Sequence, residues 1–217
     1  MTPEAARRIA FGHPALRSGG LAEVVRIVRA CAAPDAAPAR ERERMLRERE
    51  HMLNFADEHD DALLRACVPG HFTASALVLD ARGERALLTH HRKLRRWLQL
   101  GGHCDGEGNL ALVALTEAFE ESGIEGLAID PEPIDLDVHV IPARPERPER
   151  DGRPGRASEP EHLHLDTRFI VHAPPGAVER ASDESLELGW FTPAEARRLD
   201  VDASVLRLFA RAGLAPR

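Results

Sequence analysis

Residues 101–124 constrain the fold of this chain more than any other segment does. They begin with a glycine pair, continue through a short loop and end in a helical stretch that stops at Gly123. Glycine at that position favours the left-handed backbone that ends a helix. Within the helix, Glu117, Glu120 and Glu121 occupy positions i, i+3 and i+4, and such residues share one helical face. The segment therefore predicts a helix that presents a cluster of carboxylates.

A cluster of like charges on one helical face is mutually repulsive, and a divalent cation would turn that cost into a binding site. Carboxylate oxygens are the ligands that Mg²⁺ prefers, and a rigid helix holds them in place. The opposite face offers Leu112, Leu115 and Phe119 as the predicted contacts with the core. An acidic helix face is more often solvated surface, so the spacing alone does not decide between the two interpretations.

Strand and helix patterns alternate along the rest of the chain. Strands are predicted at 71–80, 85–91, 97–100, 134–141, 162–172 and 186–191, and helices at 109–122, from Thr192 and at 201–212. Residues 1–66 read as a helical extension and 67–217 as the main domain. Strands that interleave with helices in this way indicate an α/β or α+β class with a mixed sheet.

Residues 101–124 and their flanking strands resemble the Nudix box. That box reads Gly, five residues, Glu, seven residues, Arg-Glu, an aliphatic residue, any residue, Glu-Glu, any residue, Gly and an aliphatic residue. Anchored on Gly102, the match places these residues in order: Glu117, Ala118, Glu120, Glu121, Gly123 and Ile124. The resemblance covers about residues 70–200. It implies a Nudix-type α/β/α sandwich with a mixed sheet, preceded by the helical N-terminal extension.

Two positions depart from the box. Its first glutamate falls on Gly108, with Glu107 one position early, and its arginine is replaced by Thr116. In the family that pair is understood to support the loop and orient the catalytic glutamate. The departures leave the carboxylate cluster whole but remove its expected support, and Glu107 is the candidate substitute.

The resemblance implies metal-dependent hydrolysis of a diphosphate linkage in a nucleoside diphosphate joined to another moiety, of NDP-sugar, ADP-ribose or dinucleotide type. The implied catalytic residues are Glu117, Glu120 and Glu121, and the base among them is left open. The same glutamates would hold Mg²⁺, with Mn²⁺ as an alternative. The Gly102 carbonyl and a downstream acidic residue, Glu184 or Glu161, would assist them.

Other functions remain open at this point. One is the removal of abnormal nucleoside triphosphates by a pyrophosphohydrolase. Another is a catalytically weak domain that binds a nucleotide as a sensor or scaffold, which the loss of the box Arg and Glu favours. A third is an isomerase that uses Cys104 as an acid.

Residues near the box are candidates for substrate binding. Arg92, Lys93 and Arg96 precede it and suit phosphate oxygens, although a basic hairpin edge in solvent is an equal interpretation. Trp97 is placed to stack on a base, and His103 to contact the substrate. Further along, His162, His164 and Asp166 alternate on one strand face. They form either a phosphate or metal patch or, more simply, a polar strand face.

Composition excludes several classes of function. The formal net charge is −7, from 29 basic and 36 acidic residues, which argues against binding duplex nucleic acid by neutralising its phosphates. Cys31, Cys67 and Cys104 are an odd number at wide, irregular spacing, a pattern typical of neither a disulfide framework nor a zinc knuckle. No apolar run approaches the roughly 20 residues of a membrane span, and a signal-peptide pattern is missing. We therefore expect a cytoplasmic protein with no membrane contact.

The expected partner is a small phosphorylated substrate. The charged stretch 39–57 repeats Met45 and Met52 at an interval of seven. Its apolar face packs either on the main domain or on a second copy of the chain in a homodimer. Residues 142–160 carry several prolines and are predicted to form an exposed loop.

Overall fold

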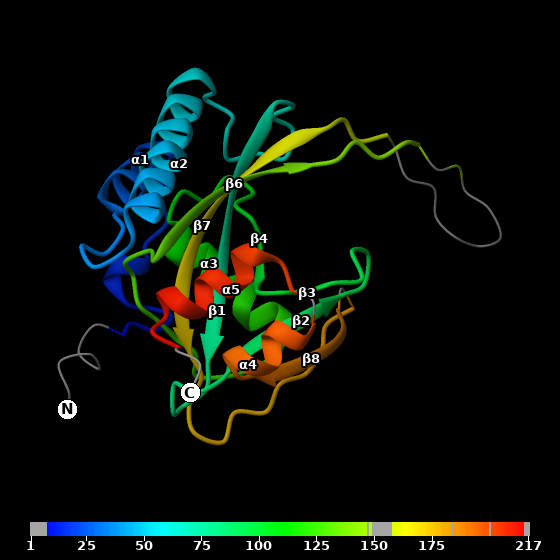
Figure 1. Cartoon of the computed structure of the whole chain (residues 1–217). Coiled ribbons are helices and arrows are strands. Elements are labelled where there is room, and N and C mark those ends of the chain that lie inside the picture. The colour runs from blue at the N-terminus through cyan, green and yellow to red at the C-terminus, as the bar shows by residue number, and fades with distance from the viewer. Residues whose placement is uncertain (1–7, 147, 149–157, 184, 200, 215–217) are drawn as a thin grey trace.

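The computed structural model describes residues 8–146, 148, 158–183, 185–199 and 201–214. Its helices are α1 (Leu21–Ala30), α2 (Ala39–Glu58), α3 (Leu110–Ser122), α4 (Pro193–Ala196) and α5 (Ala203–Arg211). Its strands are β1 (Gly70–Leu79), β2 (Ala86–His91), β3 (Trp97–Leu98), β4 (Leu100–His103), β5 (Ala128–Ile129), β6 (Asp135–Ile141), β7 (His162–His172) and β8 (Ser185–Phe191) (Figure 1). The predicted strands and helices are present, with ends that differ by a few residues.

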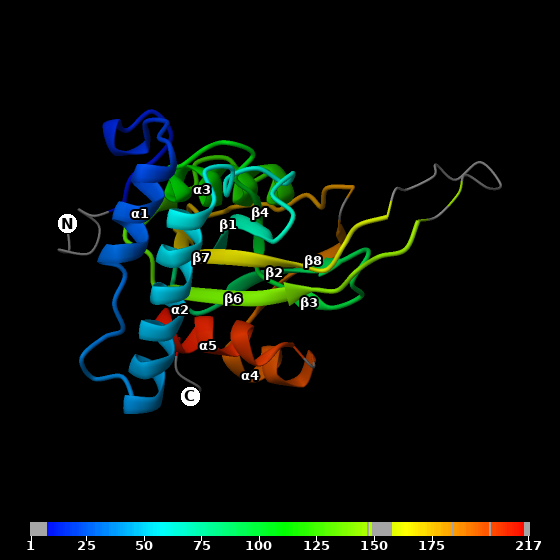
Figure 2. The ribbon, with the colours of Figure 1, turned by 90° about the horizontal axis from the view of Figure 1, so that it is seen from above.

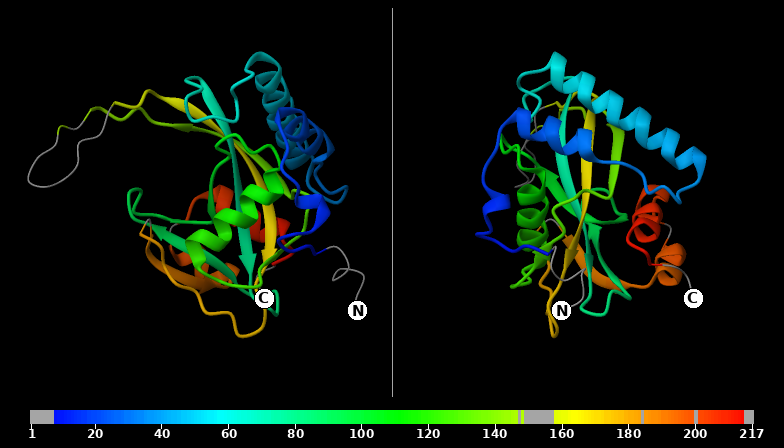
Figure 3. Two further views of the ribbon diagram at one scale, coloured as in Figure 1. Left: turned by 180° about the vertical axis from the view of Figure 1, so that it is seen from behind. Right: turned by 90° about the vertical axis from the view of Figure 1, so that its left-hand side faces the viewer.

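The elements form three layers, with α3 on one face of the sheet and α4 and α5 on the other (Figure 2). The right-hand view of Figure 3 shows the same order edge-on, with α1 and α2 lying across one side of the sandwich. This arrangement confirms the predicted α/β/α sandwich. Among the described residues, no helix is both long enough and apolar enough to cross a membrane.

Strand β1 is the centre of a mixed sheet. It runs parallel to β7 along its whole length, from the pair Gly70↔Leu163 to the pair Leu79↔His172. On its other edge it pairs antiparallel with β4 and then with β2. Strands β5 and β6 pair antiparallel with β7, while β3 and β8 pair antiparallel with β2. The β1 edge therefore brings β4, which carries the glycine pair, beside the central strand.

Both faces of β1 are covered, so every residue of the strand is buried. Because successive side chains point to opposite faces, the strand serves two cores. Phe72 and Ala76 belong to the core shared with α3, whereas Leu77 and Leu79 belong to the core shared with α5. The polar side chains of β1 alternate in step with Leu77 and Leu79, so they lie on the α5 side as well.

The helical extension packs on the main domain. Helix α2 contacts β6 and α1, and Met45 and Met52, the pair at an interval of seven, are fully buried. Their burial within one chain confirms that α2 covers the fold, while the homodimer stays a prediction. The division at residue 66 also stays a prediction, since α1 and α2 share the α3-side core. The predicted loop at 142–160 lies partly outside the described residues, and Arg144 pairs with Glu159 at its base.

One predicted core contact of α3 is wrong. Phe119 is 40% exposed, and its ring meets the edge of Phe11 at a centroid distance of 6.1 Å. Leu112 is only partly buried, whereas Leu115 is fully buried as predicted. The buried face of α3 runs instead through alanines, such as Ala114 and Ala118, because small side chains let the helix lie close to the sheet.

Candidate active site

The glycine pair of β4 lies between β1 and α3, with Gly101 packed against the β1 backbone and Gly102 beneath a side chain of α3. Gly101 pairs with Ser75 and Gly102 pairs with Ala74. A Cβ added at Gly101, where φ is +159°, would lie 2.8 Å from the Ala74 carbonyl oxygen and closer still to the Ser75 side chain. The pair therefore fixes the strand end from which the loop departs toward α3.

Helix α3 begins and ends where the sequence predicts. The Asn109 side chain accepts a hydrogen bond from the Leu112 amide at 3.2 Å, which satisfies a free donor at the helix start. Gly123 is left-handed, with φ of 63°, and its amide donates to the Phe119 carbonyl at 2.7 Å. These caps fix both ends of the helix, and its buried face sets the direction of its glutamates.

The Glu117 carboxylate lies directly over Gly102. A Cβ built at Gly102 would stand 2.5 and 2.6 Å from the two Glu117 carboxylate oxygens. The missing side chain of Gly102 therefore makes room for that carboxylate. Glu121 is 9% exposed on the side of α3 that faces the sheet, and Glu120 is exposed to solvent. The three carboxyl groups thus extend from the sheet to the surface at the end of one helix.

This donor set fits a hard divalent cation. Carboxylates at the C-terminal end of a helix are disfavoured by the helix dipole and by one another. A cation that binds several carboxylate oxygens, with the Gly102 carbonyl beside them, would offset both costs. All of these atoms are oxygens, which suit Mg²⁺ and Mn²⁺ better than metals that prefer nitrogen or sulfur.

The two departures from the box have different surroundings. The Gly108 amide donates to the Gly19 carbonyl at 2.8 Å, and a Cβ at Gly108 would collide with the Gly20 backbone, 2.9 Å from its Cα. The segment before α1 therefore occupies the space that a box glutamate would need. Nothing in the structure explains Thr116.

Glu107 has a role in holding this segment. Its carboxylate accepts hydrogen bonds from the Gly19 amide at 2.8 Å and the Asn109 amide at 2.7 Å. Although partial burial would raise its pKa, hydrogen bonds from Ser18 and the neighbouring amides lower it. Glu107 therefore ties the start of α3 to the N-terminal segment.

The basic residues before the box are mostly solvated or bound to backbone. Arg92 donates to the carbonyls of Asp183 and Ser185 at 2.8 and 2.9 Å, which joins the end of β2 to β8. Lys93 and Arg96 are exposed. Their role in substrate binding stays a prediction, as does that of Glu184, which lies outside the described residues.

Trp97 and His103 lie on the α5 side of the sheet. The Trp97 ring stacks on His90 at 5.1 Å and meets the edge of Phe191 at 4.8 Å. His103 pairs in register with Thr73, one residue along from the Gly102 pairing, so its side chain points away from α3. Adjacent residues of one strand thus serve opposite faces, and the contact of His103 with substrate stays a prediction.

Cys104 is buried, with 4% exposure. Burial raises the pKa of its thiol far above the ordinary value, and the nearby carboxylates add to the effect. Cys104 belongs to the buried core on the α3 side of the sheet, which fits a packing residue.

The α5 side of the sheet carries a buried charge network that sequence reasoning missed. The Arg168 side chain is 2% exposed and donates to Asp166 at 2.8 Å and to Asp137 at 2.9 Å. Arg207 of α5 and Arg44 of α2 both bind Asp135. The alternation of Asp135 and Asp137 in the sequence indicated a shared face, but nothing local identified their cationic partners.

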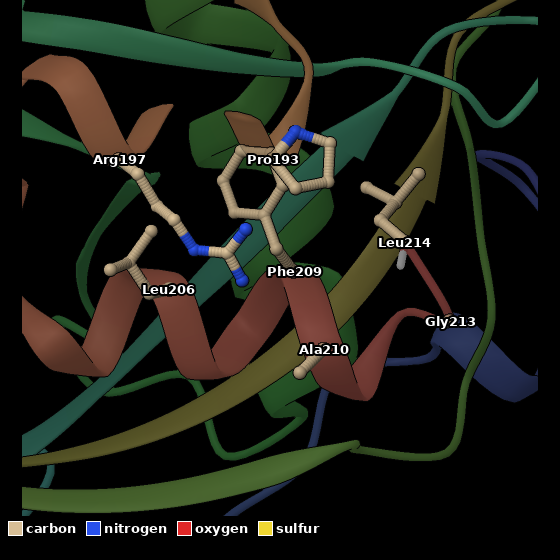
Figure 4. A pocket seen from close by; sticks show the side chains of 7 residues that line it. All are labelled: Pro193, Arg197, Leu206, Phe209, Ala210, Gly213 and Leu214. Atoms are coloured by element: carbon tan, nitrogen blue, oxygen red, sulfur yellow. The ribbon is translucent and has the colours of Figure 1, made fainter. Parts of the chain in front are cut away.

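Cavities in the described part of the chain also lie on this far side. One of about 210 Å³ is lined by residues of α4 and α5, including Pro193, Arg197 and Phe209 (Figure 4). Another, of about 680 Å³, lies between the start of α2 and α5. Neither borders the glutamates of α3, because the sheet separates them.

Comparison with known proteins identifies the family of the domain. The family model described as NUDIX domain matches residues 69–211. A C. elegans Ap4A hydrolase is 16% identical, with 65% of this chain and 94% of that chain covered and a TM-score of 0.49. A NUDIX-family hydrolase from Clostridium perfringens is 20% identical, covering 65% of this chain and 95% of that chain, with a TM-score of 0.44. No curated protein matches the chain.

A solved bifunctional NMN adenylyltransferase/ADP ribose pyrophosphatase from Francisella tularensis, complexed with AMP and a Mn ion, is also similar. It is 19% identical, with 75% of this chain and 47% of that chain covered and a TM-score of 0.40.

The fold and the family match define a hydrolase of the pyrophosphohydrolase class. Because the matched model spans more than half of the sequence, the chain belongs to the Nudix family. Nudix hydrolases generally use divalent metal ions. The predicted family and enzyme class are confirmed.

Proposed function

We propose that this protein hydrolyses a diphosphate linkage in a nucleoside diphosphate joined to another moiety, and that it does so with Mg²⁺. The substrates of this class are NDP-sugars, ADP-ribose and dinucleotide polyphosphates. The observation that carries the proposal is the Glu117 carboxylate, which lies over the side-chain-free Gly102 with Glu120 and Glu121 on the same helix.

The three glutamates and the Gly102 carbonyl would hold the metal. Bound Mg²⁺ would supply charge neutralisation at the diphosphate and activation of the attacking water. The surrounding fold supports this role because β4 and the capped helix α3 hold the donors on rigid elements. Mn²⁺ has the same preference for oxygen ligands and is expected to substitute.

The glutamates also serve the proton transfer. The water oxygen attacks one phosphorus, the bond from that phosphorus to the bridging oxygen breaks, and the leaving phosphate carries away the bonding electrons. One of the glutamates takes the proton of the water, which requires a carboxylate within hydrogen-bond reach of it. The products are two phosphorylated molecules, and the expected partner is therefore a small phosphorylated substrate.

The test is product release from a panel of substrates, with and without Mg²⁺ or Mn²⁺. The panel holds NDP-sugars, ADP-ribose, dinucleotide polyphosphates and nucleoside triphosphates. We expect Glu121→Gln to lower kcat by about 100-fold or more, because it removes a charge on which both metal and water depend. Glu125→Gln is the matched control, since Glu125 is exposed just beyond α3 and should leave kcat unchanged.

Each result has a consequence. Turnover of a nucleoside diphosphate derivative that needs both metal and Glu121 supports the proposal. Turnover restricted to nucleoside triphosphates would replace it with the triphosphate pyrophosphohydrolase. Binding of nucleotides with every substrate intact under both metals would overturn it and leave the sensor or scaffold.

A further inference from the structure

Histidines from neighbouring strands gather on the face of the sheet opposite α3. They come from β1, β4, β6 and β7: His71, His103, His139, His162 and His164. The strand register produces the cluster, because His164 pairs with His71 on one side and with His139 on the other. The ring centroids of His71 and His164 are 4.9 Å apart, and those of His71 and His162 are 5.1 Å apart.

Three of these rings converge as metal ligands do. One nitrogen from each of His71, His162 and His164 lies within 4.8 Å of the other two. A tetrahedral Zn²⁺ with Zn–N bonds of about 2.0–2.1 Å sets its nitrogens roughly 3.3–3.4 Å apart. Rotation of the imidazole rings is the movement that would bring the nitrogens to that spacing. We propose that His71, His162 and His164 bind a divalent transition-metal ion of the kind that prefers imidazole, with Zn²⁺ as the reference ion.

The hydrogen bonds of the rings fit this role. The Nδ1 atom of His162 lies 3.0 Å from the Pro160 carbonyl, to which it donates, so that its Nε2 carries a lone pair. Histidines that bind metals commonly donate their second ring N–H to a carbonyl in this way. The ring of His162 is thus held in the tautomer that a metal requires.

The other two rings have unused nitrogen atoms in the interior. His71 is 3% exposed, and neither of its ring nitrogens has a hydrogen-bond partner within the described part of the chain. The Cys67 backbone lies near this ring and acts to raise its pKa, against the larger effect of burial. The Nε2 atom of His164 is likewise buried with no hydrogen-bond partner among the described residues. Buried polar atoms normally have a partner, and a metal ion would supply one to each ring.

Burial also favours the neutral form of the His71 and His164 rings, which is the form that binds a metal ion. Burial lowers the pKa of His71, and the neighbouring His162 lowers it further. Burial and the charge of Arg65 lower the pKa of His103 to about 4. Burial likewise lowers the pKa of His164, with a further contribution from His103.

This site is separate from the glutamates of α3. Gly102 faces α3 and its neighbour His103 faces the histidine cluster, so the sheet lies between the two sites. The ligand chemistry differs in the same sense, with oxygens on one face and imidazole nitrogens on the other. Metal binding by the histidines therefore does not depend on Mg²⁺ at the glutamates.

Three protein ligands leave a fourth position open, as in zinc sites that also bind water or a substrate. His103 borders the three rings, since its ring centroid lies 5.0 Å from that of His71 and 5.1 Å from that of His164. His103 is thus a neighbour of the metal rather than one of its required ligands.

The experiment is a titration of the full chain with Zn²⁺ after treatment with a chelator, followed by isothermal calorimetry. A second titration with Co²⁺ reads the visible absorption typical of a four-coordinate ion. We expect one Zn²⁺ per chain in the presence of excess Mg²⁺. His162→Gln and His164→Gln should each weaken Zn²⁺ binding by more than about 100-fold, since even the loss of a supporting residue costs 10–100-fold.

Two control variants show whether Zn²⁺ binds at these histidines rather than elsewhere on the protein. His172→Gln lies on the same strand, where His172 pairs with Asp130 at 3.0 Å, and should leave the Zn²⁺ affinity unchanged. Glu121→Gln should also leave it unchanged. A His71→Gln variant could fail to fold because His71 lies within the central strand. His162 stands at the start of β7, so His162→Gln still tests the proposal in that case.

Three results would overturn the proposal. One is the absence of stoichiometric Zn²⁺ and Co²⁺ binding by the folded wild-type chain. Another is binding that persists in the folded variant carrying both His162→Gln and His164→Gln. The third is binding that disappears with Glu121→Gln.

Discussion

Gly102 has no side chain, and the Glu117 carboxylate occupies the space into which one would project. This pairing accounts for the glycine at the start of the box in physical terms. Strand β4 brings its backbone close to α3 at Gly102, and the Glu117 carboxylate of α3 lies in the space left by the missing side chain. The other two glutamates differ in exposure. The Glu121 carboxyl group is buried beside the sheet, whereas Glu120 is exposed to solvent.

At this scale we predict that Gly102→Ala lowers kcat by about 100-fold, since a displacement on the order of 1 Å is enough for such a loss. The new methyl group would force the Glu117 carboxylate, 2.5 Å away, out of place. Steady-state kinetics on the best substrate of the panel provide the measurement. Gly20→Ala is the matched control, because a Cβ there meets nothing within 4 Å. Equal rates for wild type and Gly102→Ala would contradict the prediction.

The segment before α1 and the start of α3 form one unit at the scale of elements. Glu107 accepts amide hydrogen bonds from both, and Gly108 lets the two backbones touch. The Asn109 side-chain amide also donates hydrogen bonds to the carbonyls of Ala15 and Arg17, each at 2.9 Å. The N-terminal segment thus supports the loop on the side where the family box has its first glutamate. The change to glycine at 108 follows from this contact.

We therefore predict that restoring the family residue by Gly108→Glu destabilises the protein. The Cβ atom would overlap the Gly20 backbone, and overpacking of this kind costs about 1–3 kcal/mol. Urea unfolding monitored by circular dichroism measures the change. Gly108→Ala adds the same Cβ without the carboxylate, so it separates steric overlap from charge. If Gly108→Glu matched the wild-type stability, the N-terminal segment would not be the reason for this departure.

At the scale of the whole molecule, a buried charge network joins elements that are distant in the sequence. Arg168 of β7 binds Asp137 of β6, and Arg207 of α5 binds both Asp135 and Asp137. Burial would raise the pKa of Asp137, but the His139 hydrogen bond and the charges of Arg168 and Arg207 hold it well below the ordinary value. The acidic face of β6 is therefore internal and neutralised by these arginines.

We predict that Arg168→Ala lowers the free energy of unfolding by about 3–5 kcal/mol, because it leaves the buried Asp166 carboxylate without its cation and removes one of the two arginines that bind Asp137. The Arg168 side chain is 2% exposed, so water cannot replace it easily. Arg26→Ala is the control, since its exposed pair with Glu23 contributes about 0.5 kcal/mol or less. Urea unfolding of both variants decides the matter, and a similar small effect for each would refute the prediction.

Local patterns in the sequence determined the elements and one face of the site. Alternation predicted the strands, the caps at Asn109 and Gly123 predicted both ends of α3, and helical spacing predicted that Glu117 and Glu121 share a face. These features depend on residues only a few positions apart. The pattern failed at Phe119, where helical spacing alone did not show which side of α3 the sheet covers.

The tertiary structure decided what depends on strand register and on long-range contact. His71 and His164 become neighbours only through the parallel pairing of β1 with β7, and Gly20 meets Gly108 only once the N-terminal segment packs on α3. Arg168 likewise forms an ion pair with Asp137 on the neighbouring strand. These contacts stabilise the fold through residues that are tens of positions apart in the sequence. The spacing of residues within one segment therefore cannot predict them.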